Sequence, residues 1–304
     1  MDEAGRIIRL RRELRAAGWS DDELRRARRS GVLRQLRRGA YLDGALPADA
    51  VERHHATTRA VLAQLGEAAV ASHVSAAVLH GLAVWNLPLD RVHVTRDRSY
   101  GGRRTRDLHL HPSPLGASDR TVVGGLAVTT CARTVVDIAR TAGFEIAVAL
   151  ADSALARRER GVPPPLLRHE LDMAVAAAAG RRGAGAVRRV AAFADGRSGS
   201  VGESRARVAL AVAGLPEPEL QFPIAVAGHR YFADFAWPRQ RVIGEFDGRV
   251  KYGRRGRPDT DALYSEKLRE DRIRSAGFAV HRWTWQDLAD FRGPAARLRA
   301  ALVP

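Results

Sequence analysis

Three acidic residues lie close together in the stretch ADFAWPRQRVIGEFDGRVKYG, residues 233–253. Alternating apolar residues predict two short strands here, one carrying Asp234 and the next carrying Glu245 and Asp247. Carboxylates that converge near the core of a sheet repel one another, so they need a counter-charge such as a divalent cation. Oxygen ligands suit Mg2+ or Mn2+, and such an ion can polarise a scissile phosphate and activate a water molecule. The spacing therefore indicates metal-dependent phosphodiester hydrolysis.

The use of lysine points to the same region. Among the 50 Lys and Arg residues only two are Lys, Lys251 and Lys267, and both follow the acidic stretch. A compact ammonium beside a metal could orient the attacking water or stabilise negative charge in the transition state. Two alternatives stay open. The two Lys can be ordinary surface residues, and the acids can form ion pairs with Arg249, Arg269 or Arg272 that only stabilise the fold.

The elements that position these residues fall within residues 200–304. The pattern predicts a helix with Glu203 in its first turn, a three-stranded meander, a second helix and a fourth strand; the ranges are 201–214, 220–226, 231–236, 241–247, 261–276 and 278–283. Alternation predicts that Ile243, Glu245 and Asp247 share one face of their strand. In the strand before it, alternation predicts one face with Phe232, Asp234 and Ala236 and the other with Tyr231, Ala233 and Phe235.

This order resembles the core of PD-(D/E)XK nucleases. The motifs ADFAWP, VIGEFDG and EKLREDRIRSAGFAVHRWTW make residues 200–290 similar to Vsr-like endonuclease-related domains. The resemblance implies that Asp234 and Glu245 bind the metal and that Glu203 is a third acid. That pattern expects Lys two residues after the second acid, where this chain has Asp247. Either one of the two Lys serves from a displaced position, or the site is altered and inactive.

The overall charge predicts a nucleic-acid partner. The formal charge is +16 and the sequence pI is about 11.3, although a general bias toward Ala and Arg is an alternative cause. Charge alone does not choose between DNA and RNA. The longest apolar stretch, around residues 173–179, is too short to span a bilayer, and no apolar run follows a basic start. We therefore expect a cytoplasmic protein without a membrane partner.

Cysteine and histidine give little further indication of a metal. The single Cys131 excludes an intramolecular disulfide and a Cys-based zinc site, and the ten His show no zinc-finger pattern, so zinc is not expected. His109 and His111 share a face of a strand predicted over residues 108–111. An i,i+2 pair can ligate a metal, but without a third nearby ligand we interpret it as ordinary strand surface.

The first 45 residues predict a winged helix-turn-helix. Residues 6–17 have apolar residues at helical spacing, and the S-x-x-E capping box from Ser20 to Glu23 predicts a second helix that ends near Arg29. Residues 32–42 then predict a small hairpin that turns at Arg38-Gly39. Helix, turn, basic helix and hairpin together favour this DNA-binding fold. The alternative is a basic helix that faces solvent and contacts nothing.

The hairpin motif RRGAYL, after a capped helix, resembles the N-terminal winged-helix domain of the AbiEi family of type IV antitoxins. This resemblance implies promoter DNA as a partner, a bacterial setting in phage defence or a toxin-antitoxin-like locus, and a cognate toxin as a further partner. The residues that we expect to bind nucleic acid are Arg25, Arg26, Arg28, Arg29, Arg37, Arg38, Arg254 and Arg255.

The middle of the chain predicts a mixture of helices and strands. Helices are expected over 51–66, 72–82 and 130–140, strands over 91–96, 108–111 and 121–129, and three Ala-rich helices within 145–195. The helix TCARTVVDIAR also resembles the middle region of AbiEi-like proteins. The segment DGRSGS, residues 195–200, is the candidate linker.

Taken together, the sequence predicts an α+β protein in three parts. These are a winged helix-turn-helix over 1–45, an α+β middle region with a helical end over 46–195, and a PD-(D/E)XK-like α/β domain over 200–304. The expected function is DNA binding with Mg2+- or Mn2+-dependent endonuclease activity. One alternative is a non-catalytic antitoxin-type transcriptional regulator with a degenerate nuclease domain, and another is an RNA-binding or RNA-cleaving protein.

Overall fold

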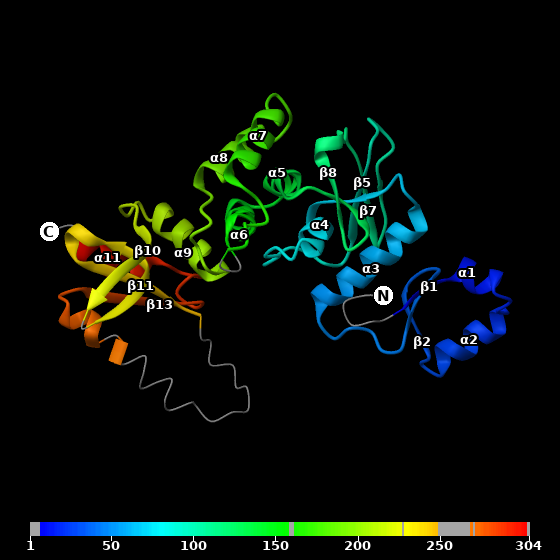
Figure 1. The fold of residues 1–304 in the computed structure, drawn as a ribbon, viewed down its shortest axis with the longest axis horizontal. Helices are drawn as coiled ribbons and strands as arrows, with labels where there is room; N and C mark the ends of the chain where they lie inside the picture. Colours follow the sequence, from blue (N-terminus) through cyan, green and yellow to red (C-terminus); the bar gives the residue numbers. More distant parts are fainter. Residues whose placement is uncertain (1–6, 158–160, 227, 249–267, 270, 303–304) are drawn as a thin grey trace. The chain divides into compact units, whose positions relative to one another are not determined.

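The computed structural model describes residues 7–157, 161–226, 228–248, 268–269 and 271–302. Helices and strands are mixed along the chain, as the expected α+β class requires (Figure 1). The chain divides into two compact units: unit 1 comprises Met1–Leu150 and Pro165–Ala192, and unit 2 comprises Ala151–Pro164 and Phe193–Pro304. Among the described residues, no helix is long and apolar enough to cross a membrane.

The N-terminal part of unit 1 is a small sheet with two helices. Its elements are β1 (Ile8–Leu10), α1 (Arg11–Ala16), α2 (Asp21–Arg29), β2 (Leu33–Arg37) and β3 (Ala40–Asp43), and the strand order is β1-β3-β2. The predicted cap of α2 is confirmed, because Ser20 Oγ accepts from Glu23 N at 3.2 Å and Glu23 Oε2 accepts from Ser20 N at 2.7 Å. The predicted hairpin is confirmed as β2 and β3, with Gly39 at a φ of 78° in its turn.

The helix predicted over residues 6–17 was wrong at its start. Ile8–Leu10 forms β1, which pairs antiparallel with β3, and the helix begins only at Arg11. The spacing of the apolar residues fits a helix locally, but pairing with a strand thirty residues later in the chain decides their conformation.

The rest of unit 1 is a six-stranded sheet with helices, in the strand order β6-β7-β5-β4-β9-β8. The strands are β4 (Val70–Ala71), β5 (Val92–Arg96), β6 (Arg103–Arg104), β7 (Leu108–Pro112), β8 (Arg120–Val123) and β9 (Leu126–Thr129). The helices are α3 (Ala50–Leu65), α4 (His73–Leu79), α5 (Cys131–Thr141), α6 (Phe144–Leu155), α7 (Arg168–Ala177) and α8 (Ala184–Phe193), of which α6 and α8 each reach into unit 2.

The apolar core of this sheet leaves polar residues on the alternate positions of β5 and β7. Val92 and Val94 of β5 are buried against Val61 of α3 and Leu79 of α4. Strands β5 and β7 run parallel, and His93 is the register partner of His109. Alternation therefore brings the histidines of the two strands together on one face.

Unit 2 is built on a four-stranded sheet in the order β10-β11-β12-β13. The elements are α9 (Val201–Val212), β10 (Glu219–Val226), β11 (His229–Trp237), β12 (Val242–Asp247), β13 (Ala279–Thr284) and α11 (Arg292–Leu302). The first three strands are antiparallel neighbours, β13 runs parallel to β12, and residues 271–275 form a helical segment before β13.

Helices cover both faces of this sheet (Figure 1). On one face, Leu210 of α9 and Leu298 of α11 pack with Phe235 and Trp283. On the other face, Ile273 packs with a second set of strand residues, Ile224, Ala233 and Ile243. The burial of apolar side chains on both faces explains why the strands are rich in aromatic and branched residues.

Side-chain alternation along β11 is interrupted, so the prediction that Tyr231, Ala233 and Phe235 share one face was wrong. Phe235 packs on the α9 face, whereas Ala233 packs on the Ile273 face, although the two were expected to point the same way. The β10–β11 register passes from Leu220–Phe235 to Phe222–Ala233, and Gln221, between these pairs, has a φ of 50°. Gln221 lies on β10, where Leu220 packs on the α9 face and Phe222 on the Ile273 face, so both paired strands change faces at this level.

The predicted domain boundaries differ from the two units. Unit 1 includes both the winged-helix region and most of the middle region, and Arg37 of β2 binds Asp107 and Gln64 across the expected boundary. The predicted linker over 195–200 lies inside unit 2, where Asp195 N donates to Asp152 Oδ1 at 2.7 Å and Ser198 is buried. Its Gly and Ser residues therefore form a packed turn.

Close packing around Gly244 gives a first prediction. A Cβ atom there would lie 2.2 Å from Cη2 of Trp283, so Gly244→Ala should lower the free energy of unfolding by roughly 1–3 kcal/mol. Gly293→Ala is the matched control, because its Cβ would meet nothing nearer than Nη1 of Arg297 at 3.7 Å and Ala favours the helix. Urea unfolding followed by tryptophan fluorescence measures both, and equal midpoints for the two variants would contradict the packing.

Candidate functional site

Asp234 occupies the interrupted position of β11 and is held there by the neighbouring strands. Its Oδ2 accepts from Phe246 N of β12 at 2.9 Å. The pKa of Asp234 is raised to about 6, first by burial and then by the negative charge of Glu203, while the hydrogen bond from Phe246 opposes the rise. Strongly raised carboxyl pKa values cluster at functional sites and also occur in structural ion-pair networks.

Glu203 lies in the first turn of α9 and faces the same position. Its Oε2 accepts from Gly199 N at 2.8 Å and from Gln221 Nε2 at 3.3 Å, and its Oε1 accepts from Ser200 Oγ at 2.9 Å. The Gln221 side chain also hydrogen-bonds Asp234. The strained residue of β10 thus connects two of the predicted acids.

Glu245, on β12, is the most buried of the predicted acids, at 7% exposure. Arg269 Nη2 lies 2.8 Å from its Oε1, and Arg282 Nη2 lies 3.1 Å from its Oε2. Burial and Asp234 raise the pKa of Glu245, and the two guanidinium groups act against them. The ion pair with Arg269 is one that the sequence left open, whereas Arg272 instead donates to the hydroxyl of Tyr231 at 2.9 Å.

Asp247, Lys251 and Lys267 are the remaining residues of the predicted catalytic set. Asp247 is half-buried at the end of β12, where Thr284 of β13 is its register partner. Lys251 and Lys267 lie outside the described residues, as do Arg254 and Arg255 of the predicted nucleic-acid surface.

The carboxylate oxygens of this acid site are the kind of ligand that a hard divalent cation prefers. Asp234 interacts electrostatically with both Glu203 and Glu245, so the three carboxylates are neighbours in unit 2. Oxygen donors are the ligands of Mg2+ and Mn2+. In the part of the chain that is described, however, these acids do not bring three ligand atoms within 4.8 Å of one another. Two arginines also hold Glu245, and a bound cation would have to displace them or share the carboxylate with them.

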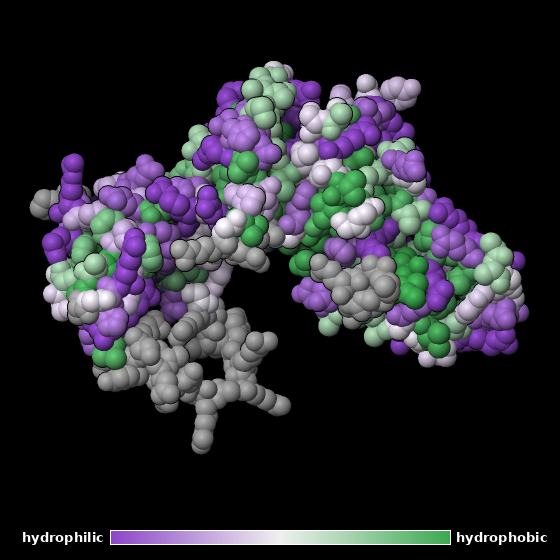
Figure 2. Space-filling view, viewed as in Figure 1, coloured by the Kyte–Doolittle hydropathy of each residue, from purple (hydrophilic) through white to green (hydrophobic). Residues whose placement is uncertain are grey.

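The basic residues of the N-terminal region are mostly at the surface. On the face shown in Figure 2, hydrophilic side chains predominate over α1 and α2. Exposed residues of the predicted set are Arg25, Arg26, Arg28, Arg29 and Arg38. Arg25 forms an ion pair with Asp22. A hollow of about 630 Å³ is lined by five basic residues, Arg11, Arg12, Arg15, Arg28 and Arg38.

Arg37 differs from the other arginines predicted to bind nucleic acid, because it is mostly buried and paired. Its side chain is only 13% exposed, and its Nε lies 2.9 Å from Oδ2 of Asp107, while Nη1 lies 2.7 Å from Oε1 of Gln64. These bonds hold the hairpin against the middle of unit 1. Arg37 therefore has a structural role that the charge pattern of the sequence does not distinguish from a surface role.

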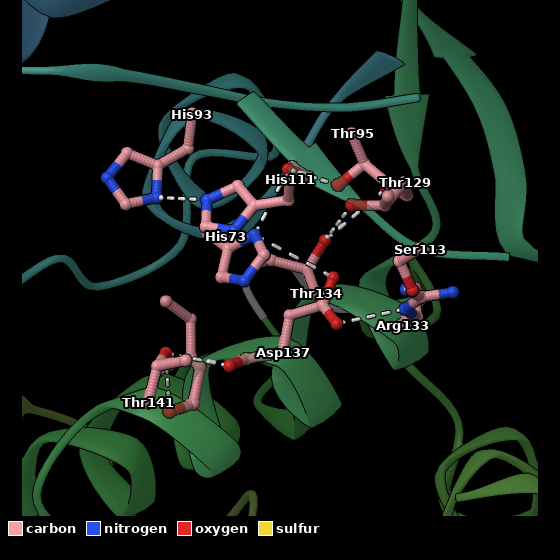
Figure 3. A network of polar contacts seen from close by, with 12 residues as sticks. His73, His93, Thr95, His111, Ser113, Thr129, Arg133, Thr134, Asp137 and Thr141 are labelled. Carbon is pink, nitrogen blue, oxygen red and sulfur yellow. Dashed lines mark hydrogen bonds and ion pairs between the residues drawn. The ribbon is translucent and has the colours of Figure 1, made fainter. Parts of the chain in front are cut away.

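A group of histidines that the sequence did not bring together lies on the six-stranded sheet of unit 1 (Figure 3). His111 stacks on His73 with ring centroids 3.9 Å apart, and Nε2 of His111 lies 3.1 Å from Nδ1 of His93. Burial and neighbouring histidines lower the pKa of His93 to about 4 and that of His111 to about 3; burial likewise lowers the pKa of His73. Lowered pKa values leave the three rings neutral at pH 7.

His111 thus has His73 and His93 beside it, two residues that the sequence did not bring to it, whereas His109 is not part of the group of three. His73 comes from the start of α4, and His93 comes from β5, which the sequence did not pair with the strand of His109 and His111. A local signal existed, since SHVS at residues 72–75 places a histidine between two hydroxyl side chains. The parallel pairing of β5 and β7 is a long-range feature that no local pattern contains.

Comparison with known proteins gives relatives without an established activity. No family model matches the chain. The uncharacterized proteins MT2308 and Rv2248 of two Mycobacterium tuberculosis strains are each 39% identical over 184 residues, which is 60% of this chain and 64% of each relative. The chain thus spans less than two thirds of the relatives it matches. The crystal structure of RV2827C protein from M. tuberculosis matches with a TM-score of 0.40 and 15% identity over 72% of this chain and 83% of that chain.

The raised pKa of Asp234 predicts the pH dependence of stability. Protonation favours the folded state, so this contribution is fully present below the ordinary Asp pKa near 4 and is lost as pH rises through about 6. Asp234→Asn has no charge to bury. It should unfold with nearly the wild-type free energy near pH 4 and be more stable by roughly 1–3 kcal/mol near pH 8.

Asp290→Asn is the control with the opposite sign. Hydrogen bonds from Arg292 lower the pKa of Asp290 to about 2, so its contribution is present above the ordinary pKa and lost as pH falls through 2. The Asp290 variant should therefore lose stability at neutral pH. Urea unfolding over a pH series compares the two, and parallel curves for wild type and Asp234→Asn would show that the carboxyl group is not perturbed.

Proposed function

We propose that the protein binds DNA and cleaves it with a divalent cation held in unit 2. The observation that carries the proposal is the partly buried Asp234, which interacts electrostatically with Glu203 and Glu245 and has its pKa raised by burial and by the charge of Glu203. A fold gains no stability from a buried carboxylate beside another acid. Such a group is more often retained for binding or catalysis.

The order of elements in unit 2 supports a nuclease of the PD-(D/E)XK type. Helix α9, the antiparallel strands β10 to β12, the helical residues 271–275 and the parallel strand β13 follow the same order as that nuclease core. Asp234 and Glu245 then lie on adjacent strands, at the positions that the resemblance assigns to metal-binding acids.

Oxygen atoms of Asp234, Glu245 and Glu203 would hold the cation, which when bound supplies a Lewis acid for the phosphate and lowers the pKa of a water molecule. The chain's own residues have separate roles. Gln221 orients Asp234 and Glu203 through its side-chain amide. Arg269 and Arg282 form ion pairs with Glu245 in this structure. They place positive charge beside the site, where it can neutralise a phosphate.

DNA binding is supported by unit 1. Its first elements, β1, α1, α2, β2 and β3, have the order of a winged helix-turn-helix, and α2 presents exposed arginines. Arg26, Arg28 and Arg29 lie in or next to the last turn of this helix. Guanidinium groups bind phosphate oxygens with two parallel hydrogen bonds, so this face suits a nucleic-acid backbone.

A second candidate function is a non-catalytic regulator of the antitoxin type. The observation that favours it is that both oxygens of Glu245 are paired with arginines, and that Asp247 occupies the place of the expected Lys. In that case the acids and arginines form an ion-pair network that stabilises a degenerate nuclease fold. DNA binding through α2 would be the whole activity, with a cognate toxin as the implied partner.

Cleavage assays separate these two functions. We expect wild-type protein to nick supercoiled DNA with Mg2+ or Mn2+ and to lose this activity with EDTA. Asp234→Asn should reduce the rate by at least about a hundredfold, because it removes a charged ligand without changing the side-chain shape. Glu245→Gln should act similarly, and Asp290→Asn, at an exposed ion pair, should cleave like wild type.

The outcomes differ clearly between the candidates. DNA binding without cleavage by the wild type, on supercoiled and single-stranded substrates, would support the regulator. Cleavage of RNA alone would support an RNA nuclease at the same acids. Unchanged cleavage by Asp234→Asn would refute the assignment of the site.

The α2 surface gives a separate prediction for DNA affinity. Arg26→Ala combined with Arg29→Ala should reduce the slope of log Kobs against log salt by about one for each phosphate that the variant no longer neutralises. The control Arg292→Ala removes an exposed guanidinium of unit 2 that is paired with Asp290. Fluorescence anisotropy over a salt series measures the slopes. An identical slope for the double variant and wild type would mean that α2 does not contact DNA.

A further inference from the structure

Backbone and side-chain hydrogen bonds hold the histidine-bearing segments of unit 1 together. Ser72 N donates to the carbonyl oxygen of His93 at 3.0 Å, and His93 N donates to Ser75 Oγ at 2.8 Å. The start of α4 is therefore fixed on β5 by two hydrogen bonds. His73, between the two serines, has a φ of 51°, a strained conformation for a residue with a side chain. Such strain persists only where the surrounding structure imposes it.

The distances between the ring nitrogens are close to those between nitrogens that bind one metal ion. One ligand atom from each of His73, His93 and His111 lies within 4.8 Å of the other two. Nε2 of His111 and Nδ1 of His93 are 3.1 Å apart. Two nitrogens that bind one Zn2+ at about 2.0–2.1 Å in a tetrahedral site lie roughly 3.3 Å apart. The pair can therefore exchange its hydrogen bond for a metal with little movement.

An unpartnered buried oxygen lies beside the third histidine. The Asp137 side chain is 4% exposed, and its Oδ1 accepts from Arg133 Nε at 3.0 Å. Its Oδ2 is buried and has no hydrogen-bond partner among the described residues, and it lies 3.9 Å from Nδ1 of His73. Metal-binding histidines usually donate their second ring N–H to such a carboxylate. Figure 3 shows Asp137, from α5, beneath the rings.

We propose that unit 1 binds one transition-metal ion, of the class represented by Zn2+, through His73, His93 and His111. Three imidazoles leave the fourth position of a tetrahedral site open for water or another ligand. The His73 ring must turn from its stacked position on His111, because a ring nitrogen binds a metal in the plane of the ring. In the proposed site, Asp137 would accept the second ring N–H of His73, whose Nδ1 contacts Ser72 Oγ at 3.0 Å in the structure.

The ligand type separates this site from the acid site of unit 2. Imidazole nitrogens select zinc and its neighbours among the transition metals, whereas carboxylate oxygens select Mg2+ and Mn2+. His109 packs on His111 with ring centroids 3.8 Å apart, but it does not belong to the group of three. The proposal is thus independent of nuclease activity.

Zinc titration of the full chain tests the proposal. The Asp234→Asn background lowers binding at the acid site, and EDTA treatment followed by buffer exchange removes any carried metal. Isothermal titration with ZnCl2 should show one high-affinity equivalent. His93→Gln and His111→Gln, at half-buried positions, should each weaken that binding at least about tenfold. The matched control is His169→Gln, at an exposed histidine of α7, which should bind like its parent.

Cobalt provides a readout of geometry. Co2+ bound by three histidines and a water gives the intense visible absorption of a four-coordinate ion, and Zn2+ should displace it. Absence of a zinc equivalent in the parent protein, or equal affinities in the parent and the His93 and His111 variants, would overturn the proposal. Because the parent is measured directly, this result does not depend on the folding of a variant.

Asp137 is proposed as a positioning residue and has its own test. Asp137→Asn should weaken zinc binding roughly 10- to 100-fold and shift the Co2+ spectrum, because His73 loses its orienting carboxylate. A purely structural role would lower the melting temperature but leave the zinc affinity of the folded protein unchanged. Thr134→Ser is a control in the same buried helix, where the hydroxyl that contacts Thr129 at 2.8 Å is retained.

Discussion

Burying a carboxylate costs several kcal/mol unless opposite charge and hydrogen bonds offset the loss of water, and both candidate sites depend on this constraint. Asp152 has a partner on each oxygen, although burial still raises its pKa. It is 1% exposed, its Oδ2 lies 2.8 Å from Arg207 Nη1, and its Oδ1 accepts from Asp195 N. Asp137 and Asp234 differ, because one has an oxygen without a partner among the described residues and the other faces a second acid. These differences mark Asp152 as structural and the other two as candidates for function.

The interruption at Gln221 shows how unit 2 accommodates its acid. In a regular strand, Asp234 would point with its alternate neighbours into a face that apolar residues fill. Opposite the left-handed Gln221 of β10, Phe235 instead packs with Trp283 and Ala233 packs with Ile243, so both cores stay closed around a polar position. The same turn places the Gln221 amide between Asp234 and Glu203.

Local features of this fold could be predicted from sequence, because they depend on neighbours in the chain. The capping box at Ser20 and the Thr130 cap of α5 involve residues three apart, and most strands follow alternation. Ile8–Leu10 was mistaken for helix because its partner strand lies far along the sequence. Even where alternation correctly put Ile243 and Glu245 on one face, it could not show that Arg282 of β13 would reach the carboxylate.

The two candidate sites also differ in how far they could be predicted from the sequence. The acids of unit 2 were found because they cluster on consecutive strands of a meander, where sequence order and spatial order agree. The histidines of unit 1 come from α4, β5 and β7, and β5 and β7 are joined in parallel with β6 between them in the chain. His93 and His111 therefore look unrelated in the sequence, although one hydrogen bond joins them.

Charge gives the final distinction between the sites. The acid site gathers negative charge, which the chain already offsets with Arg269 and Arg282, so a cation there competes with guanidinium groups. The histidine site consists of rings whose lowered pKa values leave them uncharged, and an entering metal displaces no ion pair from them. Metal occupancy at the acid site therefore depends on releasing an internal counter-charge, whereas at the histidine site it depends mainly on the turn of one ring.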